Sequence, residues 1–381
     1  MFAIQRRRLF LIITALSVLF ASIRLTSSPR AASEPIPAQL SDEAFWNMVN
    51  EFSETGGYFR SDNFVSNETT FQYVIKDLKK TKPGGVYLGV GPDQNFTYIV
   101  ALQPKIAIIF DIRRQNAMQH LMYKALVETS ANRAEFLSKL FSRKRPEGLS
   151  EKSTSEELFA AYDSIEADRQ LFRESLQEIK KQLEETHKFK LSQDDEGAIE
   201  YVLRAFYTGG PDLTYNGVGG GNLGRGRMPS YGEMMQATDA EGANLSYMGS
   251  EENFKALQEL EKKNLIVPVV GDFAGPKAIR TVAQYLKEHD AYVTAFYLSN
   301  VEQYLFQQDD DWSKFYRNVA TLPLDSSATF IRSIFNGIPA TYQSTGNALR
   351  SVSVLSSIPE LLQAFGAGEV RTYSDVINLS K

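Results

Sequence analysis

Residues 85–95 have the sequence Gly-Val-Tyr-Leu-Gly-Val-Gly-Pro-Asp-Gln-Asn, in which an apolar run ends in two glycines separated by one residue. A second apolar run follows at 106–110 and closes on Asp111. A strand ending in Gly-x-Gly, then a helix, then a strand ending in an acidic residue is typical of α/β sheets that bind nucleosides. The pattern predicts a Rossmann-like, doubly wound, mostly parallel sheet. A plain tight turn between strand and helix is the alternative.

Each residue type in this pattern has a physical role in binding a nucleoside. Gly89 and Gly91 lack a Cβ atom, so the backbone can turn sharply and a ligand can lie against it. Asp111 could accept hydrogen bonds from both ribose hydroxyls, because a carboxylate has two acceptor oxygens. Gln94 and Asn95 stand where a pyrophosphate would require a third small residue. The sequence therefore disfavours NAD and predicts a nucleoside cofactor without a pyrophosphate.

These segments resemble those of a known family. Residues 86–91 and 108–111 are similar to motifs I and II of class I S-adenosylmethionine-dependent methyltransferases. Residues 269–274 resemble that family's third strand, which ends in Gly-Asp, and residues 291–300 resemble its fourth. The resemblance extends over residues 60–335 and is interrupted by a large insertion.

A closer resemblance is carried by three shorter runs, 91–95, 111–116 and 271–277, which look like those of an uncharacterised bacterial family with a methyltransferase-like fold. The sequence departs from the methyltransferase pattern at Leu88, where an acidic residue is usual. It departs again after Asn300, where two prolines are often found. The closer resemblance thus supports the fold and adds little about the reaction.

The methyltransferase resemblance implies S-adenosylmethionine as the cofactor and assigns residues to two groups. The cofactor group is Gly89, Gly91, Asp93, Gln94, Asp111, Ile112, Arg113, Asp272 and Phe273. The substrate side, at and after the fourth strand, has the catalytic candidates Asn300, Glu302 and Tyr304. A packing or solvated role is the alternative for Glu302 and Tyr304. Because methyl transfer depends mainly on alignment and desolvation, no catalytic triad is expected.

Composition limits the other classes of function. The 381 residues are 43% hydrophobic, which is enough for one elaborated α/β domain. The formal net charge of -5 gives no case for nucleic acid as a partner. The chain has no cysteine, and its three histidines, His120, His187 and His289, are too far apart in sequence for a zinc motif. We expect a small-molecule nucleoside partner and no metal site.

The N-terminus predicts export or membrane anchoring. Arg6, Arg7 and Arg8 precede an apolar run over 9–23, which is short for a membrane span and typical of a signal sequence. A cleaved signal and an uncleaved anchor are both compatible with it, and an anchor would be the protein's membrane contact. Residues 7–11 resemble the twin-arginine signal of proteins that are exported folded. Such export could carry a bound cofactor across the membrane.

The rest of the chain divides into three parts: residues 41–127 with the first half of the sheet, an insertion over 128–260, and the second half of the sheet over 261–381. Strands are expected over 86–91, 106–111, 265–270, 291–300 and 329–334. Helices are expected over 42–51, 70–79, 95–102, 113–127, 253–262, 276–289, 313–322 and 357–365. We expect His120 to pack or form hydrogen bonds rather than act in catalysis.

The insertion combines helical and glycine-rich sequence. Residues 151–190 carry apolar side chains three and four apart among many charges, which predicts an amphipathic helical pair or one long helix. Residues 208–227 are rich in glycine and could form a lid over the cofactor, with Arg225 and Arg227 reaching an acidic substrate. Simple surface disorder is the alternative.

Two classes of function follow from the sequence. The chain could be a methyltransferase that uses S-adenosylmethionine. It could instead be an exported, non-catalytic module that reuses the fold to bind a nucleoside or to act in the cell envelope. Export favours the second class, and the order of the motifs favours the first.

Overall fold

The computed structural model describes residues 34–217, 228–335 and 351–380. The chain divides into two units, Met1–Glu34 and Pro35–Lys381, and the described helices and strands all belong to the second. Within the described residues no helix is both long enough and apolar enough to cross a bilayer. The predicted signal or anchor, with the three arginines, lies outside the described residues.

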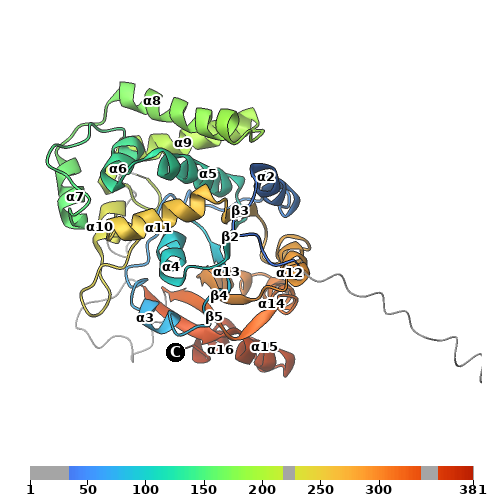
Figure 1. The fold of residues 1–381 in the computed structure, drawn as a ribbon. Coiled ribbons are helices and arrows are strands. Elements are labelled where there is room, and N and C mark those ends of the chain that lie inside the picture. Colours follow the sequence, from blue (N-terminus) through green and yellow to red (C-terminus); the bar gives the residue numbers. More distant parts are fainter. Residues whose placement is uncertain (1–33, 218–227, 336–350, 381) are drawn as a thin grey trace, which may run out of the picture. The chain divides into compact units, whose positions relative to one another are not determined.

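A six-stranded sheet forms the centre of the Pro35–Lys381 unit (Figure 1). Its strands are β1 (Val86–Val90), β2 (Ile106–Asp111), β3 (Ile266–Val270), β4 (Val293–Ser299), β5 (Leu324–Ile334) and β6 (Val352–Ser357). Their order is β3-β2-β1-β4-β5-β6, with β6 antiparallel to β5 and the other neighbours parallel. This confirms the predicted Rossmann-like α/β fold, whose strand order reverses between β1 and β4.

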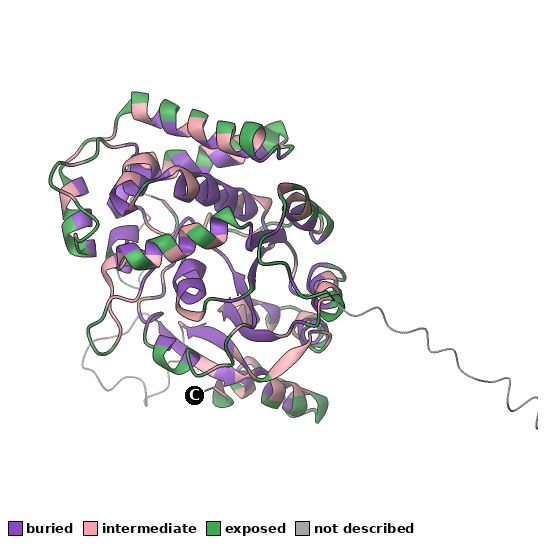
Figure 2. Cartoon of the chain, viewed as in Figure 1, coloured by how far each residue is buried: buried purple, intermediate pink, exposed green. Residues whose placement is uncertain are grey.

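The sequence explains why the inner strands are continuous apolar runs. Every residue of β1, β2 and β3 is buried, because helices cover both faces of a parallel sheet. On the β1–β3 half, α4 packs against β1, α5 against β2 and β3, and α2 against β3, whereas α15 packs against β5. Figure 2 shows the inner strands buried and the outer helices exposed on their outward sides, and the first half of β5 is only partly buried.

Most helices lie where the periodicity predicted them. They are α2 (Asp42–Glu51), α4 (Gln94–Leu102), α5 (Arg114–Thr129), α11 (Glu251–Lys262), α12 (Ala278–Glu288), α14 (Asp311–Val319) and α15 (Ile358–Gly366). Ser250 caps α11 by accepting a hydrogen bond from the Asn253 backbone, as its position before the helix predicted. The helix expected over 70–79 is shorter, because only α3 (Ile75–Leu78) is helical there.

The insertion is mainly helical. It contains α6 (Arg133–Phe141), α7 (Ser155–Asp163), α8 (Arg169–Lys180), the π-helix η1 (Lys181–Thr186), α9 (Gln193–Gly209), the 3-10 helix η2 (Gly210–Asp212) and α10 (Tyr231–Gln236). The charged stretch over 151–190 therefore forms separate helices, α7 and α8, rather than one. Figure 1 shows α8, α9 and α5 stacked in that order on one side of the sheet.

Outside the insertion, three short elements were not expected from the sequence. They are β6, α13 (Val301–Leu305) and α16 (Tyr373–Asn378). Val352 and Val354 alternate with Ser353 in β6, so the period-two pattern of a strand is present but spans few residues. Pairing with β5 over six residues supplies the stability that such a short pattern does not predict.

Candidate functional site at the carboxyl rim

The carboxyl ends of β1 to β4 meet at one edge of the sheet, here called the carboxyl rim. It is defined by residues 89–93, 111–113, 271–273 and 299–300. The Gly91 backbone N–H donates to Phe110 O at 3.2 Å, and that of Gly271 donates to Asp111 O at 2.9 Å. Parallel pairing therefore brings Gly91, Asp111 and Asp272 to one edge, where α/β sheets hold their ligands.

The Gly-x-Gly turn is occupied on its inner side by a residue of the chain itself. Asn95 Nδ2 donates to the backbone carbonyls of Val90 at 2.9 Å and Pro92 at 2.7 Å. A Cβ atom at position 89 would overlap Asn95 Oδ1, so Gly89 is required by this contact. Gly91 has φ +76°, which favours glycine at the turn. The fold thus requires glycine at both positions, whether or not a ligand binds there.

Asp111 is held in a buried ion pair with Arg113. Arg113 Nε lies 2.9 Å from Oδ1, its Nη2 lies 2.7 Å from Oδ2, and its backbone N–H donates to Oδ1 at 2.8 Å. Three donors therefore occupy a carboxylate that can accept about four. One acceptor position is left, so a ribose could bind through one hydroxyl, and binding through both would require Arg113 to move.

Residues 57–64 lie across the rim above β1 and β2. The Gly57 backbone N–H donates to Ile112 O at 2.7 Å, and Arg113 Nη1 donates to the carbonyls of Ser61 and Asp62. Asn63 adopts φ +54°. Its Nδ2 would lie 3.3 Å from the Cβ atom of any larger residue placed at position 91. This segment covers the outer side of the Gly-x-Gly turn.

Asp93 follows the turn and is completely enclosed. Its Oδ2 accepts a hydrogen bond from Tyr247 Oη at 2.9 Å, and Tyr247 Oη lies 2.7 Å from Tyr231 Oη. Burial raises the pKa of Asp93 to about 7, although the hydrogen bond from Tyr247 opposes the shift. Both tyrosines belong to the insertion, so a chain of hydroxyl groups connects the insertion to the turn.

His120 lies on the other side of the turn, on α5. Its Nε2 lies 2.8 Å from Gly91 O, and burial lowers its pKa to about 4. A neutral ring that donates from Nε2 has an acceptor lone pair on Nδ1. The structure thus confirms that His120 forms a hydrogen bond to the backbone.

Several buried polar atoms of Asp93 and of α5 have no hydrogen-bond partner among the described residues. They are Asp93 Oδ1, Gln115 Nε2, Asn116 Nδ2 and His120 Nδ1, whereas the side chains of Gln119 and Tyr123 are hydrogen-bonded to each other. All but Asp93 belong to α5, where their spacing follows the helical repeat. Buried polar atoms without a partner are rare in native proteins and mark places where a water or ligand can bind.

Gln94 connects the turn to a buried carboxylate. Gln94 Nε2 donates to Glu68 Oε2 at 2.8 Å. Glu68 Oε1 accepts from Tyr297 Oη at 2.8 Å and from Ser299 Oγ, both at the carboxyl end of β4. Glu68 is 1% exposed and lies between the ends of β1 and β4, the point where the strand order reverses.

Asp272 and Phe273 follow β3 but differ in their surroundings. Asp272 is half-buried, its Oδ1 accepts from the Ala274 backbone at 2.9 Å, and burial raises its pKa. The ring of Phe273 is stacked on that of Phe296 at 5.9 Å within the core. Asp272 therefore faces the rim, whereas Phe273 packs beneath it.

Glu302 is part of the core. Its two oxygens accept hydrogen bonds from Arg332 Nε and Nη2, and Tyr316 Oη donates to Oε1 at 2.6 Å. Glu302 is 2% exposed and Arg332 is fully buried. Removing one partner of such a pair leaves an uncompensated buried charge, which costs several kcal/mol. The geometry gives Glu302 a structural role.

Asn300 and Tyr304 are half-buried near the rim. The Tyr304 ring meets Phe59 edge-on at 5.3 Å, and the Arg113 guanidinium lies 5.8 Å from the Phe59 ring. Asn300 Nδ2 lies 3.4 Å from Gln303 Oε1. The structure thus brings Tyr304 close to the Asp111 ion pair and leaves Asn300 beside Ser299.

Three residues of the site were missed by sequence reasoning. Glu68 lies in a polar loop without periodicity, and Arg332 looks like one charge within an apolar strand. Ser299 has φ +52° at the end of β4, a strained conformation for a serine. Arg332 within an apolar strand was the available signal in the sequence. A buried arginine requires a carboxylate partner, so its presence indicates that a carboxylate is buried nearby.

The glycine-rich stretch over 208–227 is described only as far as Gly217. Its first residues complete α9 and form η2, and the Thr214 and Gly217 backbones pair in a tight turn. Residues 218–227, with Arg225 and Arg227, lie outside the described residues.

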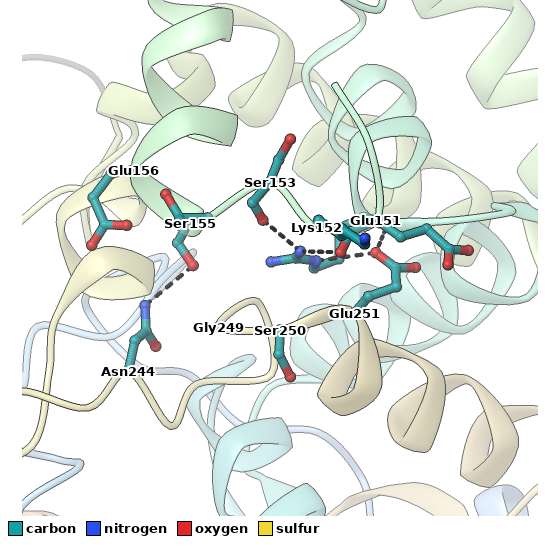
Figure 3. A pocket seen from close by; sticks show the side chains of 11 residues that line it. Glu151, Lys152, Ser153, Ser155, Glu156, Asn244, Gly249, Ser250 and Glu251 are labelled. Atoms are coloured by element: carbon teal, nitrogen blue, oxygen red, sulfur yellow. Dashed lines mark hydrogen bonds and ion pairs between the residues drawn. The ribbon is translucent and has the colours of Figure 1, made fainter. Parts of the chain in front are cut away.

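A separate pocket of about 530 Å³ lies in the insertion, where α7 and α11 begin (Figure 3). Arg133 lies beside it and is 2% exposed. Its guanidinium donates to Glu251 Oε2 at 3.1 Å and to the carbonyls of Met248, Glu151 and Ser153. The arginine is thus used in holding the insertion together, and none of the predicted site residues lines this pocket.

Comparison with known families places the chain in one of them. A domain of unknown function, DUF7790, matches residues 63–205 and 222–357, which is more than half of the chain. The chain belongs to the DUF7790 family. The matched parts of this DUF7790 protein include Glu68, the Gly-x-Gly turn, Asp111, Asp272 and residues 299–304. No curated protein matches the chain.

Proposed function

We propose that this DUF7790 protein binds S-adenosylmethionine at the carboxyl rim and is a methyltransferase of unknown substrate. Two unpartnered buried polar atoms at the Gly-x-Gly turn, Asp93 Oδ1 and His120 Nδ1, carry this proposal, since such atoms favour a polar ligand beside the turn. The strand order and the presence of Asp111 and Asp272 on the same edge support it.

In this proposal each rim residue has a defined task. Gly91 and Asp93 shape the turn, while Asp111 offers its remaining acceptor position to one ribose hydroxyl. Asp272 is the acidic group on the adenine side. Tyr304 and Asn300 lie on the side of the acceptor substrate. Residues 57–64 would have to shift outward for the ligand to enter.

Calorimetric titration of the purified chain with S-adenosylmethionine and S-adenosylhomocysteine tests the proposal. We expect a micromolar Kd for both ligands. Asp111→Asn should weaken binding about tenfold, the value of one hydrogen bond to a charged group. A Glu360→Gln variant, at an exposed helix position, is the matched control and should bind like the wild type. No heat up to millimolar ligand would refute the proposal.

A second candidate function is a non-catalytic module that reuses the fold. The Arg113 ion pair favours it, because three of the acceptor positions of Asp111 are already used within the chain. The Asn95 contacts, which fill the inner side of the turn, favour it as well. The same titration separates the methyltransferase from an envelope module with an empty site, which predicts no affinity for either ligand. A module that binds a nucleoside without catalysis would bind S-adenosylmethionine but form no S-adenosylhomocysteine from it when incubated with candidate acceptors.

We propose in addition that residues 6–23 direct the chain to export, through the folded-protein pathway. The arginines and the apolar run support this. A strain without that exporter should retain the precursor in the cytoplasm. Unchanged export in that strain would exclude the twin-arginine route. Loss of export in the double variant Arg7→Lys, Arg8→Lys would show that the exporter recognises these arginines.

A further inference from the structure

Glu68 differs from the other carboxylates of the rim in its partners. Asp111 is paired with Arg113, and Glu302 is paired with Arg332. Within the described residues no lysine, arginine or histidine is paired with Glu68. Its hydrogen bonds come from groups without charge: two hydroxyls and one side-chain amide.

A carboxylate in this position is stabilised by a positive partner. Buried carboxyl groups are either kept uncharged or paired with a cation, because an isolated charge is expensive to desolvate. Glu68 is 1% exposed, and its Oε2 accepts one hydrogen bond from Gln94, so an acceptor position is left on that oxygen. Glu68 therefore has both a free acceptor position and no cation as a partner.

The location of Glu68 fits the reacting end of a nucleoside cofactor. It contacts Gln94, next to the Gly-x-Gly turn of β1, and Ser299, at the end of β4. Asp111 and Asp272 lie on the opposite side of β1, after β2 and β3. A nucleoside with its ribose at Asp111 would extend across β1 toward Glu68. The strained backbone of Ser299, φ +52°, is a second feature of this junction.

We propose that Glu68 binds a positively charged group, a sulfonium or an ammonium, that the ligand places at the junction of β1 and β4. This inference rests on the proposed function and adds to it the identity of the residue that recognises the charge. It also predicts that a neutral ligand of the same shape binds more weakly.

Three ligands of similar shape test the proposal by calorimetry. S-Adenosylmethionine has a sulfonium, sinefungin has an amine at the corresponding position, and S-adenosylhomocysteine has a neutral sulfur. We expect both cationic ligands to bind the wild type at least about tenfold more tightly than the neutral one, as a charge-assisted hydrogen bond implies. In Glu68→Gln the three affinities should become equal, with that for S-adenosylhomocysteine unchanged.

Two further variants keep the test decisive if Glu68→Gln does not fold. Ser299→Ala removes a competing donor to Glu68, so the ratio of the affinities for cationic and neutral ligands should increase. An unchanged or smaller ratio in that variant would contradict the role of Glu68. Glu360→Gln, at an exposed helix position, is the matched control and should keep the preference of the wild type.

The outcomes separate the two proposals. Equal affinity of the wild type for all three ligands would overturn the role of Glu68 and leave the proposed function standing. Absence of binding by all three would overturn both.

Discussion

Replacing Asp93 by asparagine should change how the stability of the protein depends on pH. The carboxyl is fully buried behind the Gly-x-Gly turn, and burial raises its pKa from 3.8 to about 7. The folded protein therefore retains a proton between these values that the unfolded chain has released. Its contribution to stability is fully present below pH 3.8 and is lost as the pH rises toward 7.

The magnitude follows from the size of the shift. Each unit of pKa corresponds to about 1.36 kcal/mol, so a shift of about three units gives about 4 kcal/mol of stability lost between pH 4 and pH 8. An asparagine at this position would not titrate, and its side-chain oxygen could still accept from Tyr247. Any constant cost of the substitution cancels when the two pH profiles are subtracted. The stability of Asp93→Asn relative to wild type should therefore rise by about 4 kcal/mol over this range.

Urea denaturation followed by tryptophan fluorescence, from pH 4 to pH 8.5, measures this difference. Burial also raises the pKa of Glu261 to about 8, but that group is present in both proteins and its effect cancels. Asp309→Asn, at an exposed position, is the matched control and should track the wild type. Parallel profiles for wild type and Asp93→Asn would refute the assignment of a protonated carboxyl behind the turn.

Three other predictions concern stability. Burial alone would lower the pKa of His187, but its contacts with Glu128 and Asp42 outweigh burial and raise that pKa. The loss of unfolding free energy in His187→Gln, measured by urea denaturation, should thus be largest below pH 6.5 and shrink as the pH rises. A loss independent of pH would contradict the raised pKa. Gly89→Ala should lower the unfolding free energy by about 3 kcal/mol, because the added Cβ displaces the buried Asn95 side chain from its hydrogen bonds. A Tm unchanged in calorimetry would show that the Asn95 side chain can move aside without cost. Glu302→Gln should lower the unfolding free energy in urea denaturation by about 3–5 kcal/mol. The double variant Glu302→Gln, Arg332→Met should recover part of that loss, and additive losses would argue against the ion pair.

The sequence was sufficient to predict the sheet and most of its helices. The apolar runs of β1, β2 and β3 and the cap at Ser250 are local signals, because they depend on residues that are neighbours in the chain. The placement of Asp111 and Asp272 at one edge followed from the parallel order alone. Weak or short patterns, such as β6 and α13, were missed because pairing and packing stabilise them rather than periodicity.

The partners of the site residues were decided by the tertiary structure. The sequence indicated Asp111 as a ribose acceptor and left Glu302 open between a substrate-side and a packing role, and it predicted a partner for neither. In the structure each is matched by an arginine, Arg113 from the adjacent loop and Arg332 from β5. It gave Glu68 no role, although folding brings that residue to the junction of β1 and β4. Hydropathy specifies which segments are buried, since burial is a property of each side chain. The pairing of Glu302 with Arg332 joins residues 30 apart in the chain, which only the packed fold brings together. Arg113 is two residues from Asp111, but its turn back toward that carboxylate depends on residues 57–64, whose carbonyls accept from the same guanidinium.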